Sequence, residues 1–538
     1  MNASSVVTVV GGLGLFLLGI HHLTEGLKGL AGDSLRRALQ AMVGGRLSAI
    51  MSGALFTVVL QSSTATTLTV IGFVSAGLVT FSQAVGVIIG ATFGTTSTPW
   101  LVAIFGFRLR ISAFALPMVG IGAFLWLIAN GKTRSAGAIL AGFGLLFVGI
   151  DYLQNGMEGV SWNLDAIGGS GFGWQWILAG VGVLMSVVMQ SSSAAAAATL
   201  VAVHAGSLTF EQACAMIVGQ SVGTAATSAM VAIGAGLAVR RAALAHIVYN
   251  VSVGIIGILL LAPIAAAARW VGAQFDEPNG VLALAAFSSI FKLVGVVAFY
   301  PWLDGFSRFI ERISGRGTET AVSRLDPVLA EAGGAVALEA AWRAIMELAH
   351  GSIDAVRRRL IGELVRYDQP VEAVRQTEQF LESLSLETLD LATFEPRLVR
   401  LCHALDHLNQ LRDDLTQIPP WAGDWQPPAG FEEGARVLST WLDATKDPEA
   451  ATEPSVFEAM EDASRRLAGD RKTGRDKVLE DVALQRMSAD TARSGLDMLA
   501  WAEGAFYHAW RLAESLRIAS GRGQTRAGHQ SFAREEDR

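Results

Sequence analysis

Two short polar motifs interrupt apolar stretches of this 538-residue sequence. They read Gln61-Ser62-Ser63-Thr64 and Gln190-Ser191-Ser192-Ser193. Glutamine offers amide donors and a carbonyl acceptor, and hydroxyls can donate to an oxyanion or coordinate a small cation. No lysine or second acid stands at helical spacing from these serines to activate them as nucleophiles. The motifs therefore predict a binding site and not an enzyme.

The sequence contains two copies of one unit of about 130 residues. A shift of 129 aligns residues 61–99 with 190–228 without a gap, and 16 of the 39 positions are identical. A shift of 130 pairs glycines of 12–29 with glycines of 142–159. We expect repeat one at 5–130, repeat two at 135–268 and an extra span at 280–302.

Composition divides the chain into two parts that suit different environments. Overall, 51% of the residues are apolar and 17% are charged. Through Arg316 there are 15 Lys and Arg against 10 Asp and Glu, and the remainder has 26 against 38. Stretches able to cross about 30 Å of hydrocarbon occur at 5–23, 111–130, 136–153, 242–268 and 280–302. The first part is predicted to lie in a membrane, with 5–23 retained as a span, and the acidic second part in water, where it would repel nucleic acid.

Loop charges indicate how the two copies are oriented. The loop 24–46 carries Lys28, Arg36, Arg37 and Arg46, whereas its counterpart 154–174 carries no Lys or Arg. Because Lys and Arg prefer the cytoplasmic side, the matching loops are expected on opposite faces of the bilayer. Inverted repeats with interrupted helices are typical of secondary transporters, whose substrate sites lie near the midplane.

A glycine-threonine motif follows each Gln-Ser-Ser motif, as Gly90-Ala91-Thr92-Phe93-Gly94-Thr95-Thr96 and Gly219-Gln220-Ser221-Val222-Gly223-Thr224. The segment Ala245-His246-Ile247-Val248-Tyr249-Asn250 comes after the second. Over about residues 5–302 these motifs resemble the type II sodium/phosphate cotransporters. The resemblance implies sodium-coupled movement of inorganic phosphate, with the Gln-Ser-Ser segments at the substrate and sodium sites.

The sequence departs from the pattern of that family at four positions. Ser288 and Lys292 stand where a second histidine and asparagine are expected, and Thr92 and Ser221 replace the usual asparagine of the glycine-threonine motif. Ion stoichiometry and anion selectivity therefore stay open. Lys292 either neutralises a bound anion, pairs with neighbouring carbonyl groups or lines a wet cavity.

The predicted site collects polar residues from both repeats. No cofactor is expected besides sodium as the coupling ion. Gly94 and Gly223 are expected to shape the ends of half-helices. The residues predicted to bind phosphate and sodium are Gln61, Ser62, Ser63, Thr64, Thr95, Thr96, Thr98, Gln190, Ser191, Ser192, Ser193, Thr224, Thr227 and Asn250.

After Arg316 the apolar residues follow a helical period of 3.6. One stripe runs from Leu338 to Leu364 and ends before Pro370, and another runs from Leu398 to Ile418, bounded by Pro396. Further helices are expected at 371–388, 431–445, 455–469, 472–487 and 489–519. The pattern predicts an antiparallel helical bundle over 325–519 and a disordered tail at 520–538.

This bundle resembles the PhoU-like domains of some bacterial cotransporters. The matching segment is 406–413, in which Leu408 and Asp413 fit that family. PhoU proteins can hold metal on Glu-x-x-x-Asp pairs, and both glutamates are absent here, so no metal cluster is expected.

Together these features predict an all-α polytopic protein of the bacterial inner membrane, with the transporter at 1–316 and the bundle in the cytoplasm. A homodimer or a cytoplasmic regulatory partner of the bundle is left open. Two alternatives remain: transport of another oxyanion, and a membrane phosphate sensor that transports nothing.

Overall fold

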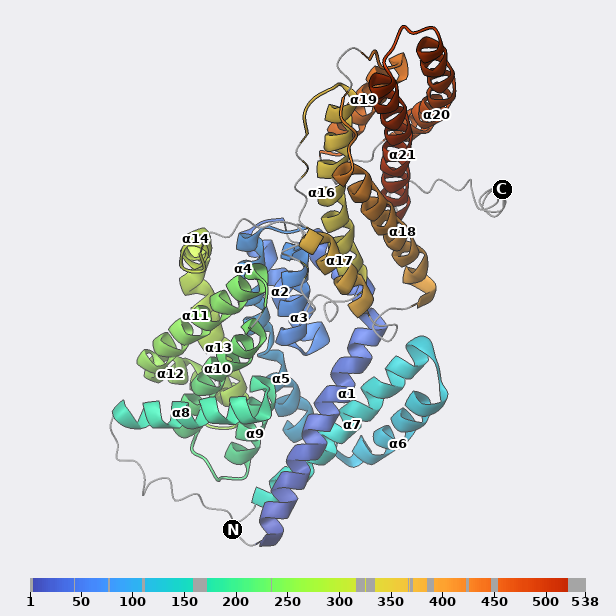
Figure 1. The fold of residues 1–538 in the computed structure, drawn as a ribbon. Helices are drawn as coiled ribbons and strands as arrows, with labels where there is room; N and C mark the ends of the chain where they lie inside the picture. Colours follow the sequence, from blue (N-terminus) through green and yellow to red (C-terminus); the bar gives the residue numbers. More distant parts are fainter. Residues whose placement is uncertain are drawn as a thin grey trace. The chain divides into compact units, whose positions relative to one another are not determined.

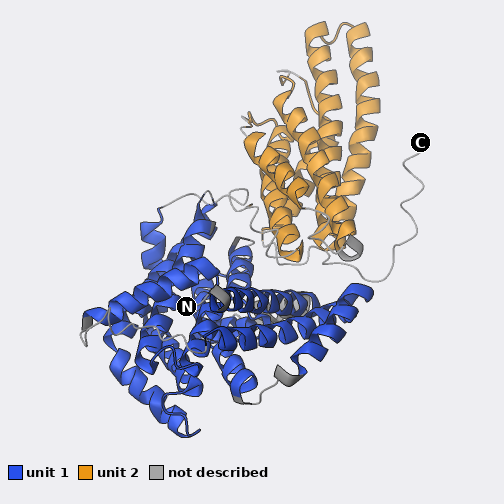
Figure 2. Ribbon diagram, turned by 90° about the horizontal axis from the view of Figure 1, so that it is seen from below, with its two compact units in different colours: residues 1–318 blue, residues 319–538 orange. Residues whose placement is uncertain are grey.

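The computed structural model describes two compact units, residues 1–318 (unit 1) and 319–538 (unit 2) (Figure 2). All the elements in the described part of the chain are helices. The structure describes residues 3–42, 44–75, 78–108, 112–157, 172–233, 235–315, 325, 334–365, 367, 371–384, 391–421, 425–446 and 453–520.

Unit 1 contains fourteen α-helices and two short helices of other types among its described residues (Figure 1). They are α1 (Ala3–Met42), α2 (Arg46–Leu60), α3 (Ser63–Ser75), α4 (Phe81–Gly94), α5 (Ser97–Leu101), the π-helix η1 (Val102–Arg108), α6 (Ser112–Ile128), α7 (Gly131–Met157), α8 (Phe172–Met189), α9 (Ser192–His204), α10 (Phe210–Ala232), α11 (Leu237–Leu259), α12 (Leu261–Ala273), α13 (Val281–Phe299), the 3-10 helix η3 (Tyr300–Trp302) and α14 (Leu303–Ile313).

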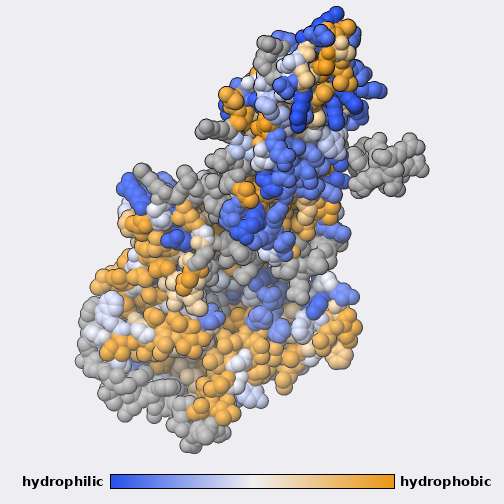
Figure 3. Space-filling view, viewed as in Figure 1, coloured by the Kyte–Doolittle hydropathy of each residue, from blue (hydrophilic) through white to orange (hydrophobic). Residues whose placement is uncertain are grey.

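Among the described residues of unit 1, five helical segments are long and apolar enough to cross a membrane. They are Ser5–Leu30, Phe81–Phe107, Gly131–Met157, Leu237–Leu259 and Val281–Ile313. Apolar side chains cover much of the surface of unit 1, whereas unit 2 is mostly hydrophilic in the same view (Figure 3). Leu116, Phe124 and Leu127 of α6, for example, are 71%, 70% and 74% exposed. These surfaces suit a lipid environment.

The segment 242–268, predicted as one span, is divided in the structure. Helix α11 ends at Leu259 and α12 begins at Leu261. Pro263 has no N–H to donate to the carbonyl of Leu259, so the helix ends one turn before it. The predicted span at 111–130 corresponds to α6, which has only 17 residues.

Glycines bring α1 and α7 into direct backbone contact (Figure 1). A Cβ added to Gly12 would lie 3.0 Å from the carbonyl oxygen of Gly149, and one added to Gly19 would lie 2.8 Å from that of Gly142. The residue numbers run in opposite directions, so the two helices are antiparallel. A shift of 130 turns Gly12 into Gly142 and Gly19 into Gly149, so each contact occurs twice with its partners exchanged, as across a twofold axis.

Equivalent glycines also pack the helices within each repeat. Helix α4 packs on α2 through Gly53 and Gly90, and α10 packs on α8 through Gly182 and Gly219. In all four cases a Cβ would overlap a backbone carbonyl group of the facing helix. Small residues at such positions let membrane helices approach closely. The sequence repeat is therefore also a repeat of packing.

Unit 2 is a helical bundle whose apolar stripes form its core. The helices among its described residues are α16 (Gly334–Leu360), α17 (Val371–Ser383), α18 (Leu391–Thr416), α19 (Ala429–Ala444), α20 (Pro454–Ala483) and α21 (Ala489–Ser520). Leu338, Ile345, Leu408 and Leu512 are fully buried. Trp342 donates to the carbonyl of Leu516 over 2.9 Å and thereby ties α16 to α21.

Three predictions for unit 2 are wrong in detail. Helix α16 ends at Leu360, and Leu364 is 92% exposed instead of extending the stripe. Helix α18 begins at Leu391, five residues before Pro396. A proline so near the start of a helix is tolerated, because it removes only one backbone hydrogen bond, the one to the carbonyl of Ala392. The helices predicted at 455–469 and 472–487 form one helix, α20, which continues through Gly469. The tail at 520–538, apart from Ser520, lies outside the described residues.

Candidate functional site

Both Gln-Ser-Ser motifs break a helix, and they do so in the same way. Gln61 follows α2 with φ 52°, and Gln190 follows α8 with φ 50°. This left-handed conformation is uncommon for residues other than glycine and stores strain. Because Gln61 and Gln190 are equivalent by the shift of 129, the two repeats place a strained glutamine at the same point.

The serine after each glutamine caps the next helix. Ser62 Oγ accepts from the backbone N–H of Ala65, and Ser191 Oγ accepts from that of Ala194, each over 3.2 Å. Helices α3 and α9 therefore begin directly at the breaks. Their first N–H groups carry the positive end of the helix dipole, which favours a negatively charged ligand nearby.

A cavity of about 410 Å³ in unit 1 lies between the two breaks. It is lined by ten of the predicted site residues, drawn from both repeats, together with parts of α1, α3, α8, α10 and α11. The ten are Gln61, Ser62, Ser63, Thr64, Gln190, Ser191, Ser192, Ser193, Thr224 and Thr227.

The two glutamines differ in how their side chains are held. Gln61 Nε2 donates to Ser97 Oγ over 3.0 Å and to the carbonyl of Val58 over 2.6 Å, and Gln61 Oε1 accepts from Thr98 over 2.9 Å. Gln190 makes no side-chain hydrogen bond to any residue that the structure describes. Its amide is therefore available to a ligand in the cavity.

The glycine-threonine motifs behave differently in the two repeats. Helix α4 ends at Gly94 and α5 begins at Ser97, as expected for a half-helix. Gly223, in contrast, lies inside the continuous helix α10, so it does not itself end a helix. Pro99, which cannot donate a backbone hydrogen bond, follows the first motif, and the equivalent residue of the second repeat is Ser228.

Gly223 instead allows close packing. A Cβ on Gly223 would lie 2.6 Å from Ser186 Cβ of α8, and one on Gly94 would lie 2.8 Å from Thr57 Cβ of α2. Both glycines thus hold the glycine-threonine helix against the helix that precedes the break.

Four predicted site residues lie beside the cavity and do not line it. Thr98 holds Gln61, and Thr96 is buried where α4 gives way to α5. Thr95 lies at the same place and contacts Lys292. Asn250 of α11 is fully buried and accepts from Ser221 of α10 over 3.3 Å, so it joins two helices.

His246 belongs to the lining although it was not among the predicted site residues. Its Nδ1 is 2.7 Å from Ser228 Oγ, and it lines the cavity on α11. The bond holds the imidazole ring in a fixed orientation and connects α11 to α10.

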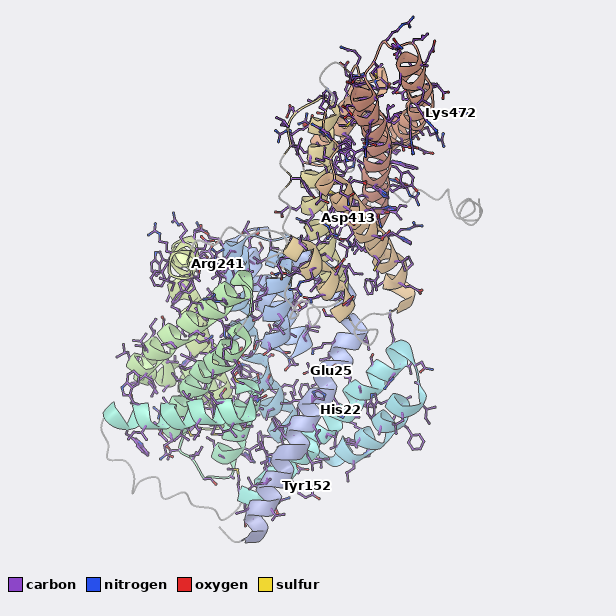
Figure 4. The ribbon with its side chains drawn as sticks, viewed as in Figure 1. His22, Glu25, Tyr152, Arg241, Asp413 and Lys472 are labelled. Carbon is purple, nitrogen blue, oxygen red and sulfur yellow. The ribbon has the colours of Figure 1, made fainter. Side chains whose placement is uncertain are left out.

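Helix α1 adds polar and charged residues to the cavity that were not among the predicted site residues. His21, Thr24, Glu25 and Lys28 line it, and Lys28 is 2.8 Å from Glu25 (Figure 4 labels Glu25 on α1). These residues recur every three or four positions, which places them on one face of the helix. In the sequence, they could have been recognised as a polar stripe on an otherwise apolar helix. In the described lining, Glu25 is the single carboxylate and it is paired.

Lys292 of α13 is 6% exposed and donates to the Thr95 hydroxyl. It lies in a separate small chamber, which shares Ser192 and Ser193 with the large cavity. The site thus combines hydroxyls, amides, two helix N-termini and a buried cation, which together suit a small oxyanion. No group of three or more His, Cys, Asp and Glu able to hold a metal ion occurs among the described residues.

Comparison with known proteins agrees with this chemistry. Residues 15–155 and 172–273 match the family model of the Na+/Pi-cotransporters. Unit 1 is similar to that family. No solved structure matches the chain significantly.

The chain is also similar to curated bacterial proteins. The chain is 28% identical over 299 residues to the "Uncharacterized protein YqeW" of Bacillus subtilis (strain 168), covering 55% of this chain and 94% of that protein. It is 24% and 25% identical over 311 residues to the "Putative inorganic phosphate export protein YjbB" of Escherichia coli O157:H7 and Salmonella typhimurium, covering 57% of this chain and 56% of each relative. The chain thus matches little more than half the length of the YjbB proteins.

Proposed function

We propose that this protein is a sodium-coupled transporter of inorganic phosphate and belongs to the Na+/Pi-cotransporters. The observation that carries the proposal is the cavity lined by both Gln-Ser-Ser breaks. The family match over 15–155 and 172–273 supports the substrate class and favours a transporter over an enzyme.

Phosphate would bind to donors that the two repeats present together. Gln190 offers a free amide, the serine and threonine hydroxyls offer further donors, and α3 and α9 direct their N-termini at the breaks. Sodium would use the hydroxyl and carbonyl oxygens that remain. Because sodium offsets the charge of phosphate, each should bind better in the presence of the other.

Inverted topology of the two repeats is part of the proposal. It is supported by the antiparallel contact of α1 with α7, whose glycines exchange partners under the shift of 130. If both helices cross the bilayer, the two repeats run through it in opposite directions, which would let the site open alternately to each side.

The multi-pass protein would lie in the bacterial inner membrane with unit 2 in the cytoplasm. The charges Arg36, Arg37 and Arg46 support this orientation under the positive-inside rule, whereas Lys28 lines the cavity. The helical bundle of unit 2 supports a PhoU-like regulatory role, with a homodimer or a cytoplasmic protein as its partner.

The proposal is tested by the uptake and release of labelled phosphate in proteoliposomes under imposed sodium gradients. Both directions are measured, because two of the relatives are named for export. Competition by arsenate and sulfate separates phosphate from other oxyanions. Phosphate binding without flux in either direction would instead support a sensor.

A further inference from the structure

The small chamber around Lys292 is lined by side chains that are typical of a cation site, but the positive charge in it is carried by the lysine side chain. The space left free beside Lys292 is about 10 Å³. The oxygen-bearing side chains that line it are Thr95, Ser192, Ser193, Gln220, Ser221 and Ser288. Hydroxyl and amide oxygens are ligands that small monovalent cations accept.

The chamber also has unused acceptor capacity. Gln220 is 1% exposed, and its Oε1 has no hydrogen-bond partner among the described residues, while its Nε2 donates to Thr199 over 2.7 Å. A buried carbonyl oxygen without a donor is costly and favours a cation close to it.

Lys292 brings a positive charge into the same chamber, although the hydrogen bond that it donates goes to Thr95 and not to Gln220. Lys292 is only 6% exposed. The described lining of its chamber contains no carboxylate. A buried ammonium group needs either oxygen ligands or an anion for compensation. Thr95 provides one oxygen, and Ser192 and Ser193 place the anion cavity next to the chamber.

We propose that the Lys292 ammonium group is a tethered cation, which takes the place of a free sodium ion in an oxygen-lined chamber and attracts the anion held in the neighbouring cavity. This inference rests on the proposed function for the identity of the anion. It predicts that the wild-type protein binds one sodium ion fewer than a variant in which the chamber is emptied.

The test is equilibrium binding of radioactive sodium and of labelled phosphate to the purified full-length protein. Lys292→Asn removes the charge, opens the chamber and adds an amide oxygen, so it should bind one more sodium per chain than the wild type. Its phosphate affinity should fall about tenfold without sodium and recover when sodium is added. Lys292→Met fills the chamber without charge or oxygen, so its phosphate affinity should fall to a similar extent and sodium should not restore it.

Lys132→Asn, at an exposed lysine of α7, is the control and should match the wild type in both assays. An unchanged sodium stoichiometry in Lys292→Asn would overturn the proposal. Ser288→Ala is a mild second variant in case the lysine variants do not fold. If Lys292 occupies the chamber, Ser288→Ala should keep its sodium affinity within twofold of the wild type, and a tenfold loss would show that sodium itself binds there.

The two proposals fail separately. If the wild type neither binds nor moves phosphate, the proposed function is wrong, and the sodium counts of the variants still decide the role of Lys292.

Discussion

Thr98 donates its hydroxyl hydrogen to Gln61 Oε1 over 2.9 Å and so links α5 to the end of α2. The equivalent residue of repeat two, Thr227, donates instead to the carbonyl of Thr224 over 2.8 Å and leaves Gln190 without that support. Two similar sequences thus build one supported and one free glutamine on opposite sides of a cavity.

Thr98→Val should weaken phosphate binding roughly two- to tenfold, because one hydrogen bond that orients Gln61 is lost. Thr98→Ser retains the hydroxyl and should stay close to the wild type. Titration of labelled phosphate into the purified variants measures both effects. Wild-type binding by Thr98→Val would show that the hydrogen bond to Gln61 does not contribute to phosphate binding.

Gln61→Ala and Gln190→Ala should each lower coupled phosphate flux about tenfold or more, as expected when a hydrogen bond to a charged ligand is removed. Gln274→Ala, at the end of α12 and away from the cavity, is the matched control. Flux is measured at equal amounts of inserted protein. Near-normal flux in both cavity variants would refute the site assignment.

Gly182→Ala and Gly180→Ala offer a matched pair on α8. A Cβ at Gly182 would overlap the carbonyl of Met216, whereas nothing lies within 4 Å of one at Gly180. Gly182→Ala should therefore destabilise the protein by about 1–3 kcal/mol, and Gly180→Ala should leave its stability unchanged or raise it by up to about 1 kcal/mol. Unfolding in detergent compares them, and equal stabilities would argue against the close contact of α8 with α10.

Unit 2 should lose stability in mild acid through His407. Burial, followed by the nearby charges of His508 and Arg511, lowers the pKa of His407 to about 4. The unfolded chain takes up this proton near pH 6.5 and the folded chain only near pH 4, so this contribution is complete above pH 6.5 and declines as the pH falls toward 4.

The test of this pH dependence follows the unfolding of the full-length protein across that range. His407→Gln has no group to protonate and should show a shallower decline. Burial raises the pKa of Asp414, whose contribution has the opposite sign, and it is present in both proteins. Parallel curves for wild type and variant would contradict the role given to His407.

The repeated parts of the site could be predicted from the sequence. Gln61 and Gln190 stand at equivalent positions in the two copies. Within apolar helices, few polar groups other than the equivalent break are available to hydrogen-bond with a polar break. The structure accordingly places both motifs on one cavity. Gly223 shares a motif with Gly94 but lies inside a continuous helix, because the break after Gly94 has Pro99 five residues further on, where the second repeat has Ser228.

Features set by tertiary contact could not be predicted in the same way. The buried position of Lys292 was open to several interpretations, and only the fold brings Thr95 and Gln220 to its chamber. The division between α11 and α12 has a local signal in Pro263, whereas the continuity of α20 through Gly469 has none, because helix packing can override a weak helix former.

We propose that one cavity built from both breaks binds phosphate and couples its movement to a sodium gradient. This proposal is tested most directly by a sodium jump across proteoliposomes that contain the reconstituted protein and labelled phosphate. Sodium should accelerate phosphate movement down the sodium gradient at least tenfold over an equal potassium jump. Equal rates with the two cations, or no movement with either, would contradict the account.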